Sequence, residues 1–295
     1  MTTETEFSNN RSDSDQGSTQ VLGVVGVGLL GGSVALAAKQ RGLAEKVIGI
    51  GRNSARLQAA VDSGVIDEFL VDLPESNAEW TTVVIATPVD RVAADVLRIA
   101  AVSRPGTVIT DVGSVKGSIC SAVGAAGLPD GVSFVGAHPL AGSEKAGFES
   151  ARGNLFDGRV TVVTRHSETD KAAAQQVRRF WEQLGSQVVE IPPEAHDSAV
   201  ATTSHLPHVT ASALAATLPE EFFPFAATGF RDTTRIAAGD PDLWVAILLE
   251  NSSAVAASMA AFSEPFRKFQ DAIENRDAGE LKKLLQLAKR NRDAL

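Results

Sequence analysis

Histidine is the side chain best suited to proton transfer near neutral pH, and this 295-residue chain holds five. His138 follows an apolar run, residues 133–137, that is typical of a buried strand. An imidazole at the end of such a strand can accept the proton of a substrate hydroxyl. We therefore identify His138 as the candidate general base, with a purely structural histidine as the alternative. His166 and His196 lie among polar residues, where a solvated role is the more common one.

A second polar set consists of Asp197, Ser204 and His208, spaced by seven and four residues. In an α-helix this spacing places all three side chains on one face, with His205 turned about 100° away. His205 and His208 alone supply too few ligands for a metal, and no cysteine lies near them. We therefore expect one helix face to carry all three side chains, and no metal site.

Arg231 and Arg235 lie four residues apart in the segment 229–236. A guanidinium group binds a carboxylate through paired hydrogen bonds, so one of these arginines is a candidate for holding an acidic substrate. Pairing of one arginine with Asp232 is the structural alternative. If the segment is helical, both arginines share a face, so their spacing does not decide which one meets the substrate.

A glycine-rich turn, residues 26–31, separates the apolar run 21–25 from a helical pattern that begins at Ser33. Its sequence, Gly-Val-Gly-Leu-Leu-Gly, is suited to close approach of the backbone to a pyrophosphate, which the helix N–H groups then face. The turn therefore predicts a dinucleotide site. The residues expected to contact the dinucleotide are Gly26, Gly28, Leu29, Leu30 and Gly31.

The end of the second predicted strand bears on the choice of nicotinamide cofactor. Sites that prefer NAD carry an acidic residue about twenty residues beyond the glycines, where it binds the ribose 2′-hydroxyl. This chain has Gly51-Arg52-Asn53 there. The 2′-phosphate of NADP is not repelled without the carboxylate, and Arg52, helped by Arg56, can pair with it. We therefore expect NADP to be preferred over NAD; a solvated Arg52 is the alternative.

The sequence pattern of the first two thirds of the chain predicts the strands and helices that position these residues. Short β-branched runs alternate with helical patterns, which is typical of an α/β, Rossmann-like, doubly wound parallel sheet covered on both faces. The predicted strands are 21–25, 46–50, 82–86, 107–110, 133–137, 161–164 and 187–191.

Ligands of such sheets bind beyond the carboxyl ends of the strands. The segments 87–89, 111–116 and 138–144 follow predicted strands, and we expect them to form one cleft with the stretch that leads to His208. The residues of these segments that we assign to the cofactor are Thr87, Pro88, Asp111 and Ser114.

The composition changes after Pro192 and Pro193, where Ala, Leu, Ser and Thr dominate and no convincing strand remains. We predict an all-α second domain, with helices from near 194 to beyond 215, over 241–262 and over 277–292. The expected divisions are a disordered tail at 1–19, a dinucleotide-binding domain at 20–192 and a helical substrate and dimerisation domain at 193–295.

Charge and cysteine content exclude several classes of protein. Lys and Arg number 27 against 36 Asp and Glu, a net charge of −9, so neither nucleic acid nor an anionic membrane is an expected partner. The uncharged stretch 21–38 holds five glycines and follows acidic residues, unlike a signal peptide or a membrane span. The single cysteine, Cys120, excludes a disulfide-built scaffold and fits a cytoplasmic location.

Six motifs occur in order between about residues 21 and 244, and in them the chain closely resembles the prephenate and arogenate dehydrogenases, the oxidative decarboxylases of tyrosine biosynthesis. The motifs are GVGLLGGS (26–33), TPV (87–89), DVGSVK (111–116), HPLAGSE (138–144), SHLPH (204–208) and FRDTTRI (230–236).

The resemblance implies that a hydride passes from C4 of a cyclohexadienol ring to NAD(P)+ while the ring carboxylate leaves as CO2. By its motifs, His138 would take the C4 hydroxyl proton and Ser114 would orient it near the nicotinamide. His208 and Ser204 would contact the substrate. Arg235 would hold a substrate carboxylate, with Arg231 and Asp232 in support.

The resemblance also implies a homodimer formed by the helical domain. Because the chain stops at Leu295, we expect no C-terminal regulatory domain and only weak or competitive inhibition by tyrosine. The choice between prephenate and arogenate stays open, since an acidic contact from Asp197 or Glu144 would favour the amine of arogenate. Two rival interpretations are a β-hydroxyacid dehydrogenase or imine reductase, and an NADP-binding redox sensor without turnover.

Overall fold

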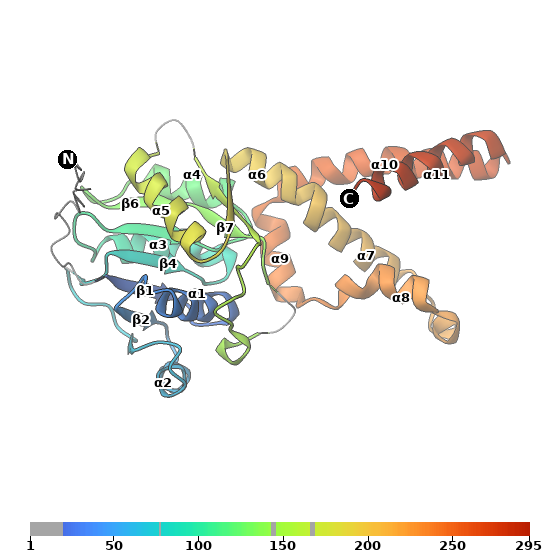
Figure 1. Ribbon diagram of the computed structural model, residues 1–295. Coiled ribbons are helices and arrows are strands. Elements are labelled where there is room, and N and C mark those ends of the chain that lie inside the picture. The colour runs from blue at the N-terminus through green and yellow to red at the C-terminus, as the bar shows by residue number, and fades with distance from the viewer. Residues whose placement is uncertain (1–19, 77, 143–145, 166–168) are drawn as a thin grey trace, which may run out of the picture.

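The β-branched runs of the first part of the chain pair as a parallel sheet (Figure 1). The computed structural model describes residues 20–295 except 77, 143–145 and 166–168, so the predicted tail at 1–19 and His166 lie outside the described residues. The six strands lie in the order β3-β2-β1-β4-β5-β6, and every pairing between them is parallel. They are β1 (Val21–Val25), β2 (Lys46–Ile50), β3 (Glu68–Leu70), β4 (Thr82–Ile85), β5 (Val108–Asp111) and β6 (Ser133–Val135).

Both faces of the sheet are covered, which explains why its central strands are apolar throughout. Val24 belongs to the core cluster that contains Val34 of α1 and Trp181 of α5, while its neighbour Val25 belongs to the cluster that contains Val96 of α3. The predicted doubly wound α/β fold is therefore confirmed. Its helices are α1 (Leu29–Gln40), α2 (Ser54–Asp62), α3 (Val92–Ala100), α4 (Gly117–Ala126) and α5 (Lys171–Gln183).

A second, three-stranded sheet lies beside the first, and the sequence pattern did not separate the two. The predicted strand 133–137 is in fact divided, because Gly136 links β6 of the large sheet to β7 (Ala137–Pro139). Strand β7 pairs antiparallel with β8 (Val160–Thr164), which pairs with β9 (Gln187–Ile191). His138 consequently lies within a strand, opposite Val162, rather than after one.

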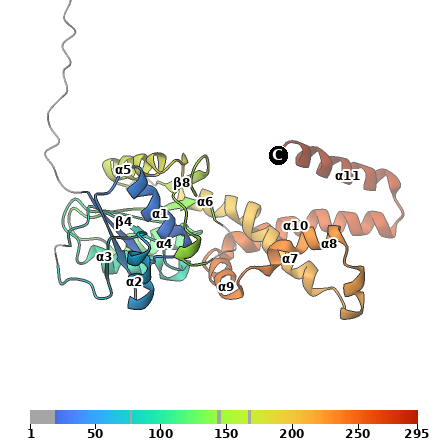
Figure 2. The same ribbon diagram turned by 60° about the horizontal axis from the view of Figure 1, so that its bottom comes forward.

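The C-terminal third is helical, as predicted, and extends away from the sheets (Figures 1 and 2). Its first helix runs from α6 (Pro193–Val200) through the π-helical turn η3 (Ala201–His205) into α7 (Leu206–Ala216). The later elements are η4 (Glu220–Phe225), α8 (Thr228–Thr234), η5 (Arg235–Ala238), α9 (Pro241–Glu250), α10 (Ser252–Glu274) and α11 (Ala278–Asp293).

The helix predicted over 241–262 is two helices, α9 and α10, bent by 92° at Asn251. Asn251 is buried, and its amide nitrogen donates to the backbone oxygen of Asp197 and lies 3.1 Å from Nδ1 of His205. This tertiary contact fixes the bend, while the apolar pattern continues on both sides of it. The single predicted helix was therefore wrong.

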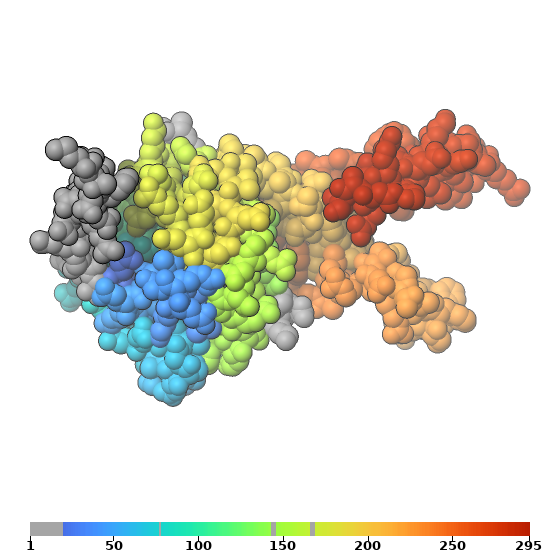
Figure 3. All heavy atoms as spheres, in the orientation of Figure 1, coloured from blue at the N-terminus to red at the C-terminus, as the bar shows by residue number. Residues whose placement is uncertain are grey.

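The helical part forms separate arms (Figure 3). It also leaves large apolar side chains exposed. Phe225 is 79% exposed, Leu249 69% and Phe266 64%. Among the described residues no single helix has the length and apolar character to cross a bilayer, although the bent pair α9–α10 meets that test by length and composition when its two helices are taken together.

Candidate active site

The glycine turn after β1 has the backbone geometry that its spacing predicts. Gly26 has φ +89°, and a Cβ atom there would lie 2.7 Å from the backbone oxygen of Ala86. A Cβ atom on Gly31 would lie 2.2 Å from the backbone oxygen of Gly26, whereas one on Gly28 would meet nothing within 4 Å. The first and third glycines are thus required for packing, and the second leaves open space beside the start of α1.

A cavity of about 750 Å³ opens beside this turn. Buried Oγ1 of Thr87 has no hydrogen-bond partner among the described atoms, so a ligand group can satisfy it. The chemistry of the lining fits a dinucleotide, because glycine backbone and four arginines face the same space. Predicted cofactor residues on this lining are Gly26, Gly28, Arg52, Thr87 and Pro88, and further lining residues are Arg56, Arg91 and Arg98.

Other predicted cofactor residues do not line this cavity, namely Leu29, Leu30, Gly31, Asp111 and Ser114. Asp111 is fully buried, and its carboxylate accepts hydrogen bonds from the backbone N–H groups of Gly113 and Ala137 and pairs with Nζ of Lys116. These contacts argue against a cofactor contact by Asp111. They tie the turn after β5, which carries half-exposed Ser114, to strand β7, which carries His138.

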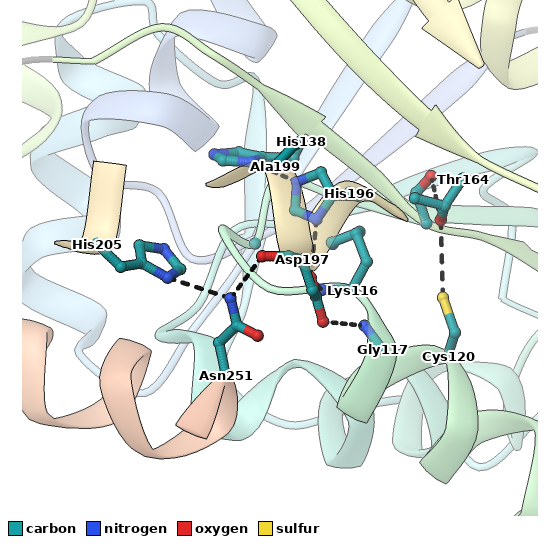
Figure 4. Close-up of polar contacts among 12 residues, drawn as sticks. Lys116, Gly117, Cys120, His138, Thr164, His196, Asp197, Ala199, His205 and Asn251 are labelled. Carbon is teal, nitrogen blue, oxygen red and sulfur yellow. Dashed lines mark hydrogen bonds and ion pairs between the residues drawn. The ribbon is translucent and has the colours of Figure 1, made fainter. Parts of the chain in front are cut away.

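His138 is the first of three side chains joined by hydrogen bonds (Figure 4). Its Nδ1 lies 2.9 Å from Nε2 of His196, and Nδ1 of His196 lies 2.8 Å from Oδ1 of Asp197. The carboxylate of Asp197 also accepts the backbone N–H groups of Lys116 and Gly117, each at 2.8 Å. The series therefore joins strand β7 to the start of α4 through helix α6.

His196 is completely buried, so the solvated role predicted for it was wrong. Helix α6 buries Pro193, His196, Asp197 and Val200, which is the i, i+3, i+4, i+7 pattern of a core-facing stripe. Two of these four residues are polar, which hid the stripe from a search for apolar periodicity. The spacing itself was the signal that could have identified His196 as a site residue.

The predicted face of Asp197, Ser204 and His208 is only partly present. Asp197 and His208 are buried, but Ser204 is exposed and His205 is 2% exposed. The π-helical turn η3 is the cause, because each of its residues advances less around the helix axis than an α-helical residue does. His205 therefore takes the inward position that regular spacing assigned to Ser204.

His208 stacks on Trp244, a residue that sequence reasoning did not assign to the site. The ring centroids lie 3.5 Å apart, and the planes differ by 9°. Nδ1 of His208 is buried without a partner in the described part of the chain. The backbone of Ile236 lies within reach of the His208 side chain, and Arg235, which precedes Ile236, is exposed. Arg231 is exposed, and its Nε donates to the backbone oxygen of Ala226.

Burial sets the protonation of these groups. The pKa of His138 lies well below 6.5 because of burial first, and then because of His196, Lys116 and His205. Burial also lowers the pKa of His205 to about 4. For Asp197, burial raises the pKa, but hydrogen bonds from His196 and from the backbone outweigh it, so the pKa lies below its usual value. A neutral His138 and an ionised Asp197 follow at neutral pH.

A metal site has no support within residues 20–295 outside the gaps, since no three His, Cys, Asp or Glu side chains cluster there as ligands would. Cys120 lies apart from the histidines, near Thr164, and burial raises the pKa of its thiol to about 11. The site is therefore one of imidazole, carboxylate and glycine backbone.

Comparison with known proteins assigns both parts of the chain to one family. Residues 34–190 match the family described as "Prephenate dehydrogenase, nucleotide-binding domain", and residues 192–287 match "Prephenate dehydrogenase, dimerization domain". The chain belongs to the prephenate dehydrogenase family. The resemblance drawn from the six motifs, and the expectation of an enzyme of this family, are thereby confirmed.

Individual members of the prephenate dehydrogenase family show how far the similarity extends. The chain is 35% identical over 282 residues to a prephenate dehydrogenase of Bacillus subtilis, covering 92% of this chain and 75% of that protein. The crystal structure of prephenate dehydrogenase from Aquifex aeolicus with hydroxyphenyl propionate and NAD+ has a TM-score of 0.86 and 32% identity, over 95% of this chain and 99% of that one. Synechocystis arogenate dehydrogenase has a TM-score of 0.79 and 29% identity, over 93% and 99%.

Proposed function

We propose that the protein catalyses the NAD(P)-dependent oxidative decarboxylation of prephenate to 4-hydroxyphenylpyruvate. The observation that carries this proposal is the position of His138, in strand β7 and 2.9 Å from His196, in a fold shared with prephenate dehydrogenases. An imidazole whose pKa is lowered by burial stays free to accept a hydroxyl proton at neutral pH.

We assign the cofactor to the cavity beside the glycine turn. When bound there, oxidised nicotinamide supplies the acceptor for the substrate hydride. Gly26 and Gly28 would hold the pyrophosphate at the start of α1, and Oγ1 of Thr87 would bind a polar group of the cofactor. NADP is the proposed preference, because Arg52 lines the cavity and Gly51 offers no carboxylate to bind a 2′-hydroxyl.

The substrate is assigned to the side of His138 that faces the helical domain. His138 would take the proton of the C4 hydroxyl, and Ser114, on the tethered turn after β5, would orient it. Arg235, which precedes Ile236 near the His208 side chain, would bind a substrate carboxylate. Ser204 and Arg231, which are exposed as Arg235 is, are further proposed substrate contacts.

Prephenate is preferred to arogenate in this proposal because of Asp197. An amine would need an acidic partner, and the carboxylate of Asp197 is already engaged by His196 and two backbone N–H groups. The other candidate, Glu144, lies outside the described residues. Arogenate stays the second candidate because of the similarity to the Synechocystis arogenate dehydrogenase.

The active form is proposed to be a homodimer built by the helical domain. An apolar cavity of about 600 Å³ lies between α7 and α10 and includes Leu214, Met259 and Phe266, each of them exposed. A second copy of the chain would cover this surface, as the name of the matching dimerization domain suggests. A cytoplasmic location is proposed as well, since the cofactor and the single thiol of Cys120 suit a reducing compartment.

The experiment that tests the function measures the near-ultraviolet absorbance of reduced nicotinamide with purified protein. Prephenate or L-arogenate is combined with NAD+ or NADP+ in all four pairings, and released CO2 is measured in parallel. Prephenate with NADP+ is expected to give the highest kcat/KM. No signal in any pairing, with cofactor binding confirmed by titration, would refute the proposal and favour a redox sensor or another reductase.

A further inference from the structure

The hydrogen-bonded series of His138, His196 and Asp197 has a direction that follows from its last member (Figure 4). Asp197 accepts backbone N–H groups at both carboxylate oxygens, and its lowered pKa keeps it ionised. An ionised carboxylate has no proton to donate. In the hydrogen bond of 2.8 Å between Asp197 and His196, the proton therefore belongs to Nδ1 of His196.

The tautomer of His196 in turn determines that of His138, the candidate base. In the resting arrangement of the series, His196 carries a single N–H, at Nδ1, so its Nε2 is an acceptor. Nε2 of His196 lies 2.9 Å from Nδ1 of His138, which must then carry the proton of that bond. Nε2 of neutral His138 is left with a free lone pair, as a general base requires.

We infer that His196 is a positioning residue and a proton relay: with Asp197 it directs the lone pair of His138 to Nε2, and it receives a proton from His138 during the reaction. This inference rests on the proposed function for the identity of the proton donor, the substrate hydroxyl. The tautomers, in contrast, are properties of the protein without substrate.

The relay moves one proton per step and leaves no charge unaccounted for. The substrate O–H bond breaks as an N–H bond forms at Nε2 of His138, and the N–H bond at Nδ1 of His138 breaks as one forms at Nε2 of His196. His138 returns to a neutral ring, and His196 becomes an imidazolium that keeps its N–H bond to Asp197. Release of that proton to solvent by the reverse route restores the starting tautomers.

The charges around the two rings favour the proton on His196. Asp197, on the same helix, contacts His196 directly, while the ammonium of Lys116 on the turn after β5 disfavours a positive charge on His138. Asp111 of β5 pairs with that ammonium, and His205 of the π turn also disfavours a proton on His138. Within the described part of the chain, the side-chain hydrogen-bond partners of completely buried His196 are His138 and Asp197, so its proton passes to one of these.

The first test records the tautomers of the protein alone. Long-range proton–nitrogen spectra of histidine-labelled protein at about pH 7.5, above the ordinary histidine pKa, should show N–H at Nδ1 and a lone pair at Nε2 for His138 and His196. Asp197→Ala removes the oxygen that accepts from Nδ1 of His196, so both rings should lose the fixed Nδ1–H form. Glu194→Gln, an exposed carboxylate change on the same helix, should leave both rings unchanged. A wild-type His138 with N–H at Nε2 would overturn the inference.

The second test separates transfer of the proton from orientation of the ring. His196→Gln keeps an oxygen that can accept from Nδ1 of His138 but cannot carry a proton onward. Single-turnover rates should fall about 10²-fold, at the lower end of general-base effects, with KM near the wild-type value. The dependence of rate on deuterium fraction should change from curved, for two protons, to linear, for one. His196→Phe, which also removes the acceptor, should be slower still and lose the Nδ1–H tautomer of His138.

The outcomes distinguish this inference from the proposed function. If neither prephenate nor arogenate is turned over, the proposed function fails, and the tautomers still decide whether Asp197 orients the two rings. If turnover is found and His196→Gln retains the wild-type single-turnover rate and a curved deuterium dependence, the relay is refuted while the enzyme assignment stands. Thermal unfolding of each variant identifies any that is not folded. If the variants do not fold, the tautomers in the spectra of the wild-type protein decide the inference.

Discussion

Replacement of Arg52 by alanine should remove the preference for NADP. Arg52 follows β2, lines the cavity beside the glycine turn and is exposed, and no acidic side chain of residues 20–295 outside the gaps forms an ion pair with it. Its guanidinium is therefore available to a 2′-phosphate. A hydrogen bond to a charged group contributes about 1.5–3 kcal/mol, and solvent at this open site favours the lower half of that range.

A loss of about 1.5–2 kcal/mol corresponds to about a 10-fold to 30-fold lower kcat/KM for NADP+ in Arg52→Ala. The value for NAD+ should change little, because NAD carries no 2′-phosphate. Steady-state assays with each cofactor at saturating substrate give the ratio. Arg179→Ala is the matched control, since Arg179 lines a different cavity together with Val21 and Thr82.

The converse variant, Gly51→Asp, should shift the preference to NAD. A Cβ atom at Gly51 would lie 3.6 Å from Leu57, an ordinary contact, so the backbone can accept the carboxylate without strain. A wild-type ratio that favours NAD and does not respond to Arg52→Ala would refute the assignment of Arg52 to the 2′-phosphate.

Three further predictions concern the site and its supports. His138→Asn should lower kcat by about 10²–10⁴-fold, with the cofactor affinity retained. Because the pKa of His138 is lowered, wild-type kcat/KM should rise with pH only below about 6.5 and be level above it. A rise in kcat/KM centred above pH 7, the neutral point, would contradict this assignment. Lys116→Met should lower the free energy of unfolding, measured in urea, by about 3–5 kcal/mol, because it leaves the carboxylate of Asp111 buried without its cation. Lys289→Met, which breaks an exposed ion pair, should change the free energy of unfolding little. The pKa of His205 falls from 6.5 to about 4 on folding, so the unfolded chain binds more protons between these pH values. The free energy of unfolding should therefore decrease by on the order of 2 kcal/mol from pH 6.5 to 4, after allowance for solvent screening. A free energy of unfolding that rises on acidification would refute this.

Much of the cofactor end could be read from the chain, because its constraints are local. Gly26 and Gly31 lie where a side chain would collide with backbone of the same β1–α1 unit or the adjacent strand, and such collisions admit only glycine. Apolar runs predict strands for a similar reason, since a strand buried on both faces needs apolar residues at successive positions. The division of 133–137 between two sheets was not readable, because burial looks the same in either sheet.

The acid–base end depended on contacts between distant segments. His196 looked solvated by its neighbours in sequence, and only the packing of α6 against α4 shows that it is buried between His138 and Asp197. The π turn exchanged the positions expected for Ser204 and His205.

The sequence by itself therefore determined the parallel sheet, the glycine turn, the helical second part and the family, because these depend on residue type and spacing within single elements. Only the tertiary structure decided which side chains the histidines contact and where the helices bend. Those properties are set by hydrogen bonds across separations such as the 58 residues between His138 and His196, and the spacing within one helix can mark a buried face but not the distant side chains that it contacts.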